Sequence, residues 1–427
     1  MSSGSAPDAS DSEDETNFGR LLNITAAELT ALASRIRDMV FKTETVDGRQ
    51  VKICMGSFNV VHILQLDEFM MVIRIPTTGQ SGDLRDAAKE AFESQVQTLN
   101  YIRKHTSVPV PQVYHFDTTA DNEIHAPYIA MGYVSGRTVS NLWFDASGPT
   151  PLEHRRRNIL KQLAKAMSQL QELPFNKIGS LLLGSRGGIH DLGPCYDWDE
   201  AENGTSTITS SGPFSTIDSF LKSSWAPTNT KSVYAIGATK VLEEMLPFLP
   251  QTSEYVLALP DYDSQNVMAD EEGNLTGIID WDNAQTVPSF MGCLRYPGWI
   301  TRDWDPLMYG WPMEGEDSPD DLQRYRAYYL DEMMQVLKLK GSSDYRITEK
   351  SHVFEAFWIA ASSEPNRTSI CRKFVEEAKC GLKGEELSDG LGQDALGILY
   401  EIAHGELDDE DWKKLRKGLE ALMSQEQ

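Results

Sequence analysis

Several hallmarks of common protein classes are absent from this 427-residue sequence. Its five cysteines form no C-x-x-C pair, and an odd, scattered set favours reduced thiols over a disulfide framework. No apolar stretch approaches the length of a membrane span, and the first residues do not resemble a signal peptide. The eight histidines include no pair at metal-ligand spacing, which argues against a zinc site. We therefore expect a cytoplasmic protein with no membrane partner.

Positive charge is also scarce. The sequence has 39 Lys and Arg against 64 Asp and Glu, a formal net charge of -25. Such a chain repels nucleic acid and anionic membrane surfaces, so we expect no nucleic-acid partner. It could attract a cationic small molecule, although the plainer interpretation is that the charge confers solubility. A hydrophobic content of 40% predicts a packed globular core.

The first part of the chain predicts a disordered tail followed by a small sheet. Residues 1–17 are acidic, rich in serine and without an apolar anchor, which is typical of disorder. Apolar residues recur at helical spacing over 25–40 and 84–104. Between these helices the period changes to two and predicts strands over 51–64 and 70–76. We expect an N-terminal lobe over residues 18–134.

The second part of the chain is predicted to be mainly helical. Helical periodicity is strong over 152–173 and returns over 214–250 and 320–427. Residues 179–214 are rich in glycine and serine, with few apolar repeats, and predict a long irregular excursion. We expect residues 135–427 to form one C-terminal lobe.

The most informative stretch places an acid, an amide and a second acid in order. Asp261 is followed five positions later by Asn266, and an apolar hairpin pattern then leads to Asp280. This order is used by kinase-like catalytic loops, in which the first acid serves as base and the other two side chains bind magnesium. The structural alternative is a turn-forming Asp261 after a proline, and an ordinary hairpin with a polar residue at each end.

Phosphate-binding candidates lie in the predicted sheet. Gly56, Ser57 and Asn59 fall in a turn between two strands, where backbone amides can point at phosphate oxygens. Arg74 lies in the buried strand 70–76, where a kinase-like fold needs a cation for the nucleotide phosphates. The alternatives are a simple hairpin turn for the glycine and a structural carboxylate pair for Arg74.

A segment rich in tryptophan and aspartate offers candidate substrate contacts. Aromatic faces and carboxylates together can hold an ammonium group, so a cationic amine or amino alcohol is one candidate substrate. The alternative is core packing beside a solvated acidic loop. The candidate side chains of this segment are Asp282, Trp299, Asp303 and Asp305.

These motifs together resemble the aminoglycoside phosphotransferase and choline kinase-like family. The resemblance runs from about Val51 to Tyr309. The segments that carry it are Gly56-Ser-Phe-Asn, Val72-Ile-Arg-Ile-Pro, Pro109-Val-Pro, Asp261–Asn266 and Gly277-Ile-Ile-Asp-Trp-Asp. The segment from Gly292 to Trp299, followed by Asp303-Trp-Asp-Pro, looks like a fungal branch.

The resemblance implies an α+β, protein-kinase-like bilobal fold, with a small antiparallel-sheet N-lobe and a mainly helical C-lobe. By resemblance, Asp261 would be the catalytic base, Asn266 and Asp280 would bind Mg²⁺, and Arg74 would contact the phosphates of ATP or GTP. The adenine-side hinge would be the segment Met131–Val134, including Met131, Tyr133 and Val134. The implied function is transfer of the nucleotide γ-phosphate to a hydroxyl of a small-molecule substrate.

Three positions depart from the family pattern. Leu259 stands where the catalytic loop usually has a histidine that braces it, and Arg74 stands where the cation is usually lysine. Gln95 falls where a helix carboxylate should pair with that cation. The alternative function is therefore a catalytically inactive pseudokinase that acts as a binding or regulatory module. The identity of the substrate, the choice between ATP and GTP and the oligomeric state are open at this point.

Overall fold

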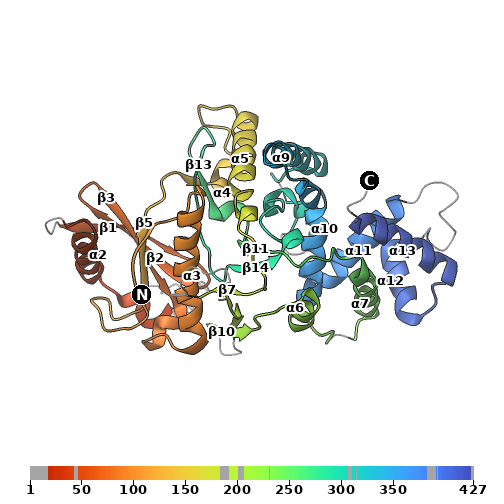
Figure 1. The fold of residues 1–427 in the computed structure, drawn as a ribbon, viewed down its shortest axis with the longest axis horizontal. Helices are drawn as coiled ribbons and strands as arrows, with labels where there is room; N and C mark the ends of the chain where they lie inside the picture. The colour runs from red at the N-terminus through yellow and green to blue at the C-terminus, as the bar shows by residue number, and fades with distance from the viewer. Residues whose placement is uncertain are drawn as a thin grey trace, which may run out of the picture. The chain divides into compact units, whose positions relative to one another are not determined.

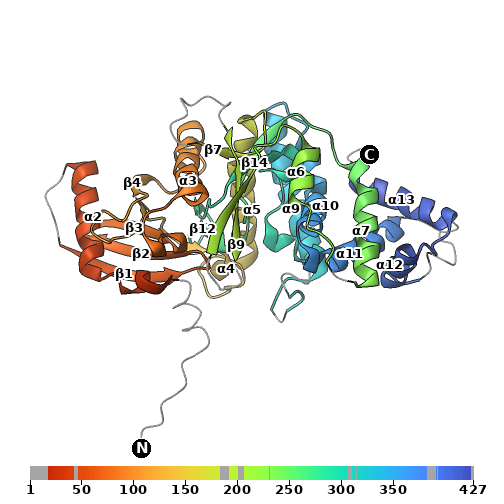
Figure 2. The same cartoon turned by 90° about the horizontal axis from the view of Figure 1, so that it is seen from below.

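The structure is a computed structural model, and its described part divides into two compact units (Figures 1 and 2). The described residues are 18–42, 47–182, 192–200, 206–229, 231–305, 310–313, 315–381, 391 and 393–424. Unit 1 contains Met1–Gly136, Gly179–Pro213 and Thr276–Gln285. Unit 2 contains Arg137–Ile178, Phe214–Leu275 and Thr286–Gln427. The predicted disordered tail, residues 1–17, lies outside the described residues.

The division between the units is more interleaved than a single change of lobe. The predicted change between residues 134 and 135 lies close to the first boundary, between Gly136 and Arg137. Two later segments, Gly179–Pro213 and Thr276–Gln285, also belong to unit 1. The second of these contains Asp280, so the sheet-bearing unit holds one of the predicted metal ligands.

Unit 1 is built on a five-stranded antiparallel sheet with the order β1-β2-β3-β5-β4. Its strands are β1 (Gly48–Met55), β2 (Asn59–Leu66), β3 (Phe69–Pro76), β4 (Val113–Asp117) and β5 (Tyr128–Gly132). Arg74 of β3 lies opposite Val61 of β2 and Ile129 of β5. The predicted strands around the Gly56 turn and the third strand that ends at Pro76 are confirmed.

Each face of this sheet is covered by a helix (Figure 1). Helix α2 (Ala26–Phe41) begins at a capping box between Thr25 and Glu28 and packs on Met71, Ile73 and Ile75. Helix α3 (Asp86–His105) packs on the other face, where Val72 joins its cluster. Successive residues of a strand point to opposite faces of the sheet. Because β3 has apolar residues at odd and at even positions, both of its faces are buried.

The prediction of an irregular excursion over 179–214 was wrong. This region contains β7 (Ser180–Leu181), β8 (Leu192–Gly193), β9 (Cys195–Glu200) and β10 (Ser206–Ser211). Strands β9 and β10 form an antiparallel ladder, and the Tyr196 hydroxyl donates to Glu90 Oε2 of α3 at 3.1 Å. Because this hairpin packs on α3, aromatic and β-branched residues make a strand here despite the glycine and serine around them.

Unit 2 is mainly helical, as predicted. Its helices are α4 (Val139–Leu142), α5 (Leu152–Met167), α6 (Ile217–Ser224), α7 (Val233–Met245), α9 (Pro319–Leu339), α10 (Tyr345–Ser362), α11 (Glu364–Gly381), α12 (Ala395–His404) and α13 (Asp409–Met423). Helices α7, α11, α12 and α13 pack against one another at the C-terminal end of the chain (Figures 1 and 2). Among the described residues, no helix combines the length and apolar character that a membrane crossing needs.

Short strands of unit 2 connect the helices to the candidate site. Strand β11 (Tyr255–Ala258) forms a two-stranded sheet with β14 (Gln285–Pro288). Strand β12 (Val267–Ala269) pairs with β6 (Arg137–Thr138), with Met268 opposite Thr138. The chain passes from unit 2 to unit 1 between Leu275 and Thr276, at the start of β13 (Leu275–Ile278).

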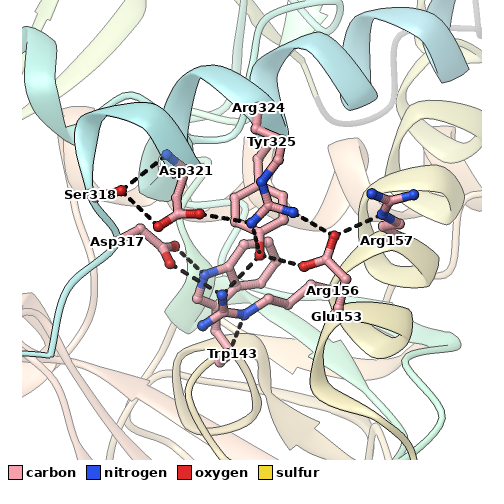
Figure 3. Close-up of polar contacts among 9 residues, drawn as sticks. All are labelled: Trp143, Glu153, Arg156, Arg157, Asp317, Ser318, Asp321, Arg324 and Tyr325. Carbon is pink, nitrogen blue, oxygen red and sulfur yellow. Dashed lines mark hydrogen bonds and ion pairs between the residues drawn. The ribbon is translucent and has the colours of Figure 1, made fainter.

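A polar network joins α5 and α9 in unit 2 (Figure 3). The Arg156 guanidinium donates to Asp317 Oδ1 at 3.2 Å and to the Tyr325 hydroxyl at 2.9 Å, and it lies 5.1 Å from the ring centroid of Trp143. Trp143 Nε1 donates to the other oxygen of Asp317 at 2.6 Å. Because Arg156 and Asp317 are both mostly buried, this network fixes the ring of Trp143 firmly between the two helices.

Candidate functional site

The loop after β11 brings two of the predicted residues together. The Asn266 side chain donates from Nδ2 to Asp261 Oδ2 at 2.8 Å and to the Asp261 carbonyl at 3.0 Å. Gln265 Nε2 also donates to Asp261 Oδ2 at 2.8 Å. Asp261 is exposed, whereas Asn266 is buried beneath it at 5% exposure. The loop therefore presents a carboxylate whose direction is fixed by an amide five residues later.

The hydrogen bonds of Asn266 also decide which of its atoms could bind a metal. Its nitrogen is used by Asp261, and its oxygen accepts no hydrogen bond from the described residues. An amide oxygen is a hard ligand of the kind that Mg²⁺ prefers. Asn266 thus fits the predicted role of metal ligand, and the same contact orients the predicted base.

Residues on both sides of Asp261 are held by a later segment of unit 2. Arg295 Nη2 donates to the carbonyls of Leu259 and Pro260, at 2.7 and 2.9 Å. Gly298 N donates to the carbonyl of Tyr262 at 2.8 Å. Arg295 and Gly298 were missed by the sequence reasoning, because a contact with a main-chain carbonyl leaves no pattern in the residues of the loop itself.

Aromatic packing and an ion pair add to these contacts. The ring of Tyr262 lies edge-on to Trp299, which lies edge-on to Trp143 of the network in Figure 3. Asp263 forms an ion pair with Arg302 at 2.8 Å. The neighbours of Asp261 are thus anchored in the helical part of unit 2 while the Asp261 carboxylate itself faces solvent.

In unit 1, Arg74 is bound by two carboxylates of the segment that follows β13. Its guanidinium contacts both oxygens of Asp282, at 2.5 and 2.6 Å, and Asp280 Oδ1 at 2.7 Å. Asn59 Nδ2 donates to Asp282 Oδ2 at 3.0 Å. The partners of the buried cation are therefore Asp280 and Asp282, the latter predicted as a substrate contact, and not a carboxylate of helix α3.

The electrostatics of this cluster follow from burial and charge. Burial disfavours the charged form of Arg74, but Asp282 and Asp280 outweigh it and raise the pKa of Arg74 above its ordinary value. Asp280 has a φ of +60°, a left-handed conformation that few residues other than glycine, asparagine and aspartate adopt. This turn points the Asp280 side chain at Arg74, with 41% of it still exposed.

The predicted phosphate turn has a glycine that packing within the protein does not require. Gly56 donates its N–H to the Asn59 carbonyl at 3.0 Å, and Ser57 is exposed beside it. A Cβ on Gly56 would meet its nearest neighbour at 3.8 Å, an ordinary contact. Phe58 stacks on Trp198 of β9, with ring centroids 4.3 Å apart. Trp198 was missed because the β9–β10 hairpin was not predicted.

The predicted hinge lies against β13, the strand that precedes Asp280. Met131 is buried at the end of β5, whereas Tyr133 is 42% exposed. A Cβ on Gly277 would lie only 2.4 Å from Val134 Cγ1, so the close approach of the hinge to β13 requires glycine. The predicted nucleotide residues and Asp280 therefore all belong to unit 1, with the Gly56 turn beside the end of β3 and the hinge beside its start.

Three of the predicted substrate side chains lie in unit 2, with contacts of their own. Both oxygens of Asp303 accept from Arg326, at 2.6 and 3.0 Å. Trp299 is 5% exposed and Asp305 is 2% exposed. These contacts match the structural alternative for the segment, and a substrate role for these side chains and for Asp282 stays a prediction.

The two predicted metal ligands belong to different units, Asn266 to unit 2 and Asp280 to unit 1. Across the described residues, no group of three His, Cys, Asp or Glu side chains gathers as a metal site on its own. Magnesium commonly takes amide and phosphate oxygens as ligands besides carboxylates. The assignment of Mg²⁺ to these two residues stays a prediction.

Comparison with known proteins decides the family. The family model described as "Phosphotransferase enzyme family" matches residues 71–288, just over half of the chain. The chain belongs to this family. The matched segment includes Arg74, Asp261, Asn266 and Asp280. The predicted relation to aminoglycoside phosphotransferases and the α+β, protein-kinase-like fold class are confirmed.

Two curated relatives of the phosphotransferase chain are fungal proteins. A subtelomeric hrmA-associated cluster protein of Aspergillus fumigatus is 24% identical over 352 residues, which cover 67% of this chain and 66% of the relative. The clavilactone A biosynthesis cluster protein Y of Ampulloclitocybe clavipes is 21% identical over 257 residues, which cover 56% of this chain and 60% of the relative. The chain thus spans just under two thirds of the length of these relatives.

Solved structures of phosphotransferases also align with the chain. Aminoglycoside phosphotransferase APH(4)-Ia is 15% identical with a TM-score of 0.43, and the alignment covers 90% of this chain and all of that one. Spectinomycin phosphotransferase APH(9)-Ia, in complex with ADP and spectinomycin, is 13% identical with a TM-score of 0.36, covering 90% and 99%.

Proposed function

We propose that this phosphotransferase-family chain is a magnesium-dependent kinase that transfers the γ-phosphate of ATP or GTP to a hydroxyl of a small molecule. One observation carries the proposal. The exposed carboxylate of Asp261 is held by the amide of Asn266, and the amide oxygen is left available to a metal. The proposal is supported because this arrangement leaves one carboxylate for a hydroxyl and one amide oxygen for a metal side by side in the same loop.

In this proposal Asp261 acts on the substrate hydroxyl. Its carboxylate orients the hydroxyl and accepts the proton as the new O–P bond forms and the bond to the β-phosphate oxygen breaks. The hydrogen bonds from Asn266 and Gln265 both reach Oδ2 of Asp261. They fix the direction of the carboxylate before the substrate binds, which lowers the cost of reaching the reactive geometry.

Arg74, Asn266 and Asp280 serve the nucleotide end of the reaction. Magnesium, when bound by Asn266 and Asp280, would neutralise charge on the phosphate oxygens. Arg74 contacts one oxygen of Asp280, and the other makes no contact within the described residues, so Asp280 retains a ligand atom. Asp282, which also accepts from Asn59 Nδ2, accepts from both Nη atoms of Arg74. The guanidinium fork can bind phosphate oxygens in pairs when it exchanges this contact with Asp282 for the nucleotide.

A second candidate function is that of a catalytically inactive pseudokinase, which acts as a binding or regulatory module. The observation in its favour is that Arg74 is neutralised by Asp280 and Asp282, so a predicted metal ligand and the predicted phosphate cation contact each other. Thermal unfolding with nucleotide, with and without Mg²⁺, separates the candidates in part. A magnesium-dependent rise in melting temperature favours the kinase, and no rise with any nucleotide favours the second candidate.

The decisive variant is Asp261→Asn, which keeps the size of the side chain and removes its charge. We expect turnover to fall by about 10²- to 10⁴-fold, because proton transfer by a positioned base contributes about this much. Nucleotide affinity, measured by calorimetry, should change little. Asp331→Asn, at an exposed position of α9, is the matched control and should keep full turnover. Wild-type turnover in Asp261→Asn would contradict the assigned role.

A further inference from the structure

The backbone on the N-terminal side of Asp261 is held by one arginine. Arg295 Nη2 donates to the carbonyls of Leu259 and Pro260, the two residues that directly precede Asp261. Pro260 has no N–H, and the Leu259 side chain is apolar and 1% exposed. Neither residue can therefore brace the loop through a polar side chain of its own, and Arg295 supplies those contacts.

Arg295 is itself fixed on the helical part of unit 2. Its Nε lies 3.5 Å from Glu355 Oε1 of α10, and 12% of the Arg295 side chain is exposed. Its guanidinium is 5.9 Å from the ring centroid of Tyr262, which follows Asp261. A donor held on three sides in this way can fix the position of a backbone segment, whereas a mobile surface arginine could not.

We propose that Arg295 is a positioning residue that sets the place of the Asp261 carboxylate. The expected effect of Arg295 on turnover rests on the proposed function. The bracing of the loop by Arg295 does not depend on that function. Asp261 lies between the carbonyls held by Arg295 and the Tyr262 carbonyl held by Gly298. These contacts hold the backbone on both sides of Asp261. The Asp261 side chain is then oriented by its hydrogen bond from Asn266.

The variant Arg295→Met tests this inference, because it keeps an unbranched stem but removes every donor. The chain offers a matched control. Arg326 is equally buried, with 11% of its side chain exposed, and donates to the Ile300 carbonyl and to Asp303. Arg326→Met therefore also breaks a carbonyl contact and an ion pair in unit 2, but Arg326 makes no hydrogen bond or ion pair with the described residues of the Asp261 loop.

Hydrogen exchange followed by mass spectrometry gives a readout that does not depend on activity. In Arg295→Met we expect amides of residues 259–266 to exchange about tenfold faster, as loss of roughly 1.4 kcal/mol of local stability implies. Peptides from α9 should be unchanged. In Arg326→Met the exchange of residues 259–266 should match the wild type. Unchanged exchange of the loop in Arg295→Met would overturn the inference.

Kinetics separate this inference from the proposed function. If the wild type transfers phosphate, kcat of Arg295→Met should fall by about 10- to 100-fold with the nucleotide KM unchanged, since a misplacement of about 1 Å can cost 10²-fold. Guanidinium ion added to Arg295→Ala should restore part of kcat. A looser loop with wild-type kcat would overturn the positioning role. A wild type without activity would refute the proposed function, while the exchange result still decides whether Arg295 braces the loop.

Discussion

At the scale of single residues, the cluster around Arg74 shows how one chain replaces a missing partner. A buried guanidinium needs a carboxylate, and Gln95 on α3 cannot supply one. Asp282 does so from a segment more than two hundred residues away in the sequence. The sequence predicted that Arg74 would be buried and charged, since it lies in an apolar strand. Its partner was not predictable, because nothing in the local pattern marks a contact across that separation.

A double-mutant cycle on Arg74 and Asp282 measures this replacement. We expect Arg74→Met and Asp282→Asn to show a coupling free energy of ~1–3 kcal/mol in urea unfolding, because each single variant leaves the other group buried without its partner. The exposed pair Glu153 and Arg157, which is 2.8 Å apart, is the control and should couple by less than ~1 kcal/mol. Equal coupling in the two pairs would contradict the structural role of Asp282.

His62 provides a pH dependence that can be measured without knowing the substrate. It is 3% exposed on β2, and neither ring nitrogen has a hydrogen-bond partner among the described residues. Burial lowers the pKa of His62 from 6.5 to about 4. Between these values the unfolded chain binds a proton that the folded chain does not, so the free energy of unfolding falls as the pH falls through this window.

The expected loss from His62 is up to ~3 kcal/mol by pH 4. His62→Leu should remove this contribution and should not destabilise the protein at pH 7, because the leucine leaves no buried polar atom unpaired. Urea unfolding from pH 7 to pH 4, followed by hydrogen exchange in β2, measures the difference. A pH profile in His62→Leu that matches the wild type would contradict the account of His62.

At the scale of elements, long periodic segments were predictable and short inserted strands were not. Helices α2, α3 and α5 follow apolar periodicity in the sequence, and β1 to β3 follow a period of two around the Gly56 turn. Strands β9 and β10 were missed because glycine and serine surround them and because their partners, on α3 and at Phe58, are far away in the sequence. Tertiary packing, rather than local propensity, makes these strands.

Two glycines in unit 1 give a matched pair of variants for the nucleotide site. Gly277→Ala should destabilise the protein by ~1–3 kcal/mol, because its Cβ would lie 2.4 Å from Val134 Cγ1. Gly56→Ala should leave stability nearly unchanged, since its Cβ would meet nothing closer than 3.8 Å. Under the proposed function it should still weaken nucleotide binding by about tenfold or more, or ~1.4 kcal/mol. Urea unfolding and calorimetry measure the two quantities.

The opposite pattern would contradict the role given to the Gly56 turn. If Gly56→Ala lowered stability as much as Gly277→Ala, the glycine would serve the fold and not a ligand. If Gly56→Ala bound nucleotide as tightly as the wild type does, a phosphate would not need glycine at position 56 in order to approach the turn.

At the scale of the whole molecule, the chain does not divide at one point. After the chain has entered unit 2, it returns to unit 1 at Gly179–Pro213 and again at Thr276–Gln285. The second return carries Asp280 to Arg74, so the residues that the sequence grouped as one motif are shared between two units. Composition along the chain carries no signal for these later returns, because they depend on contacts between residues that are far apart in the sequence.

The measurement that addresses the proposed phosphotransferase activity most directly is transfer of labelled γ-phosphate. Purified protein would be incubated with labelled ATP or GTP, Mg²⁺ and a library of hydroxyl-bearing metabolites that includes amines, beside Asp261→Asn and Asp331→Asn. We expect label on at least one acceptor with the wild type and with Asp331→Asn, and a loss of about 10²-fold or more with Asp261→Asn. Equal labelling by Asp261→Asn, or no labelling of any acceptor by the wild type, would contradict a kinase that uses Asp261 as its base.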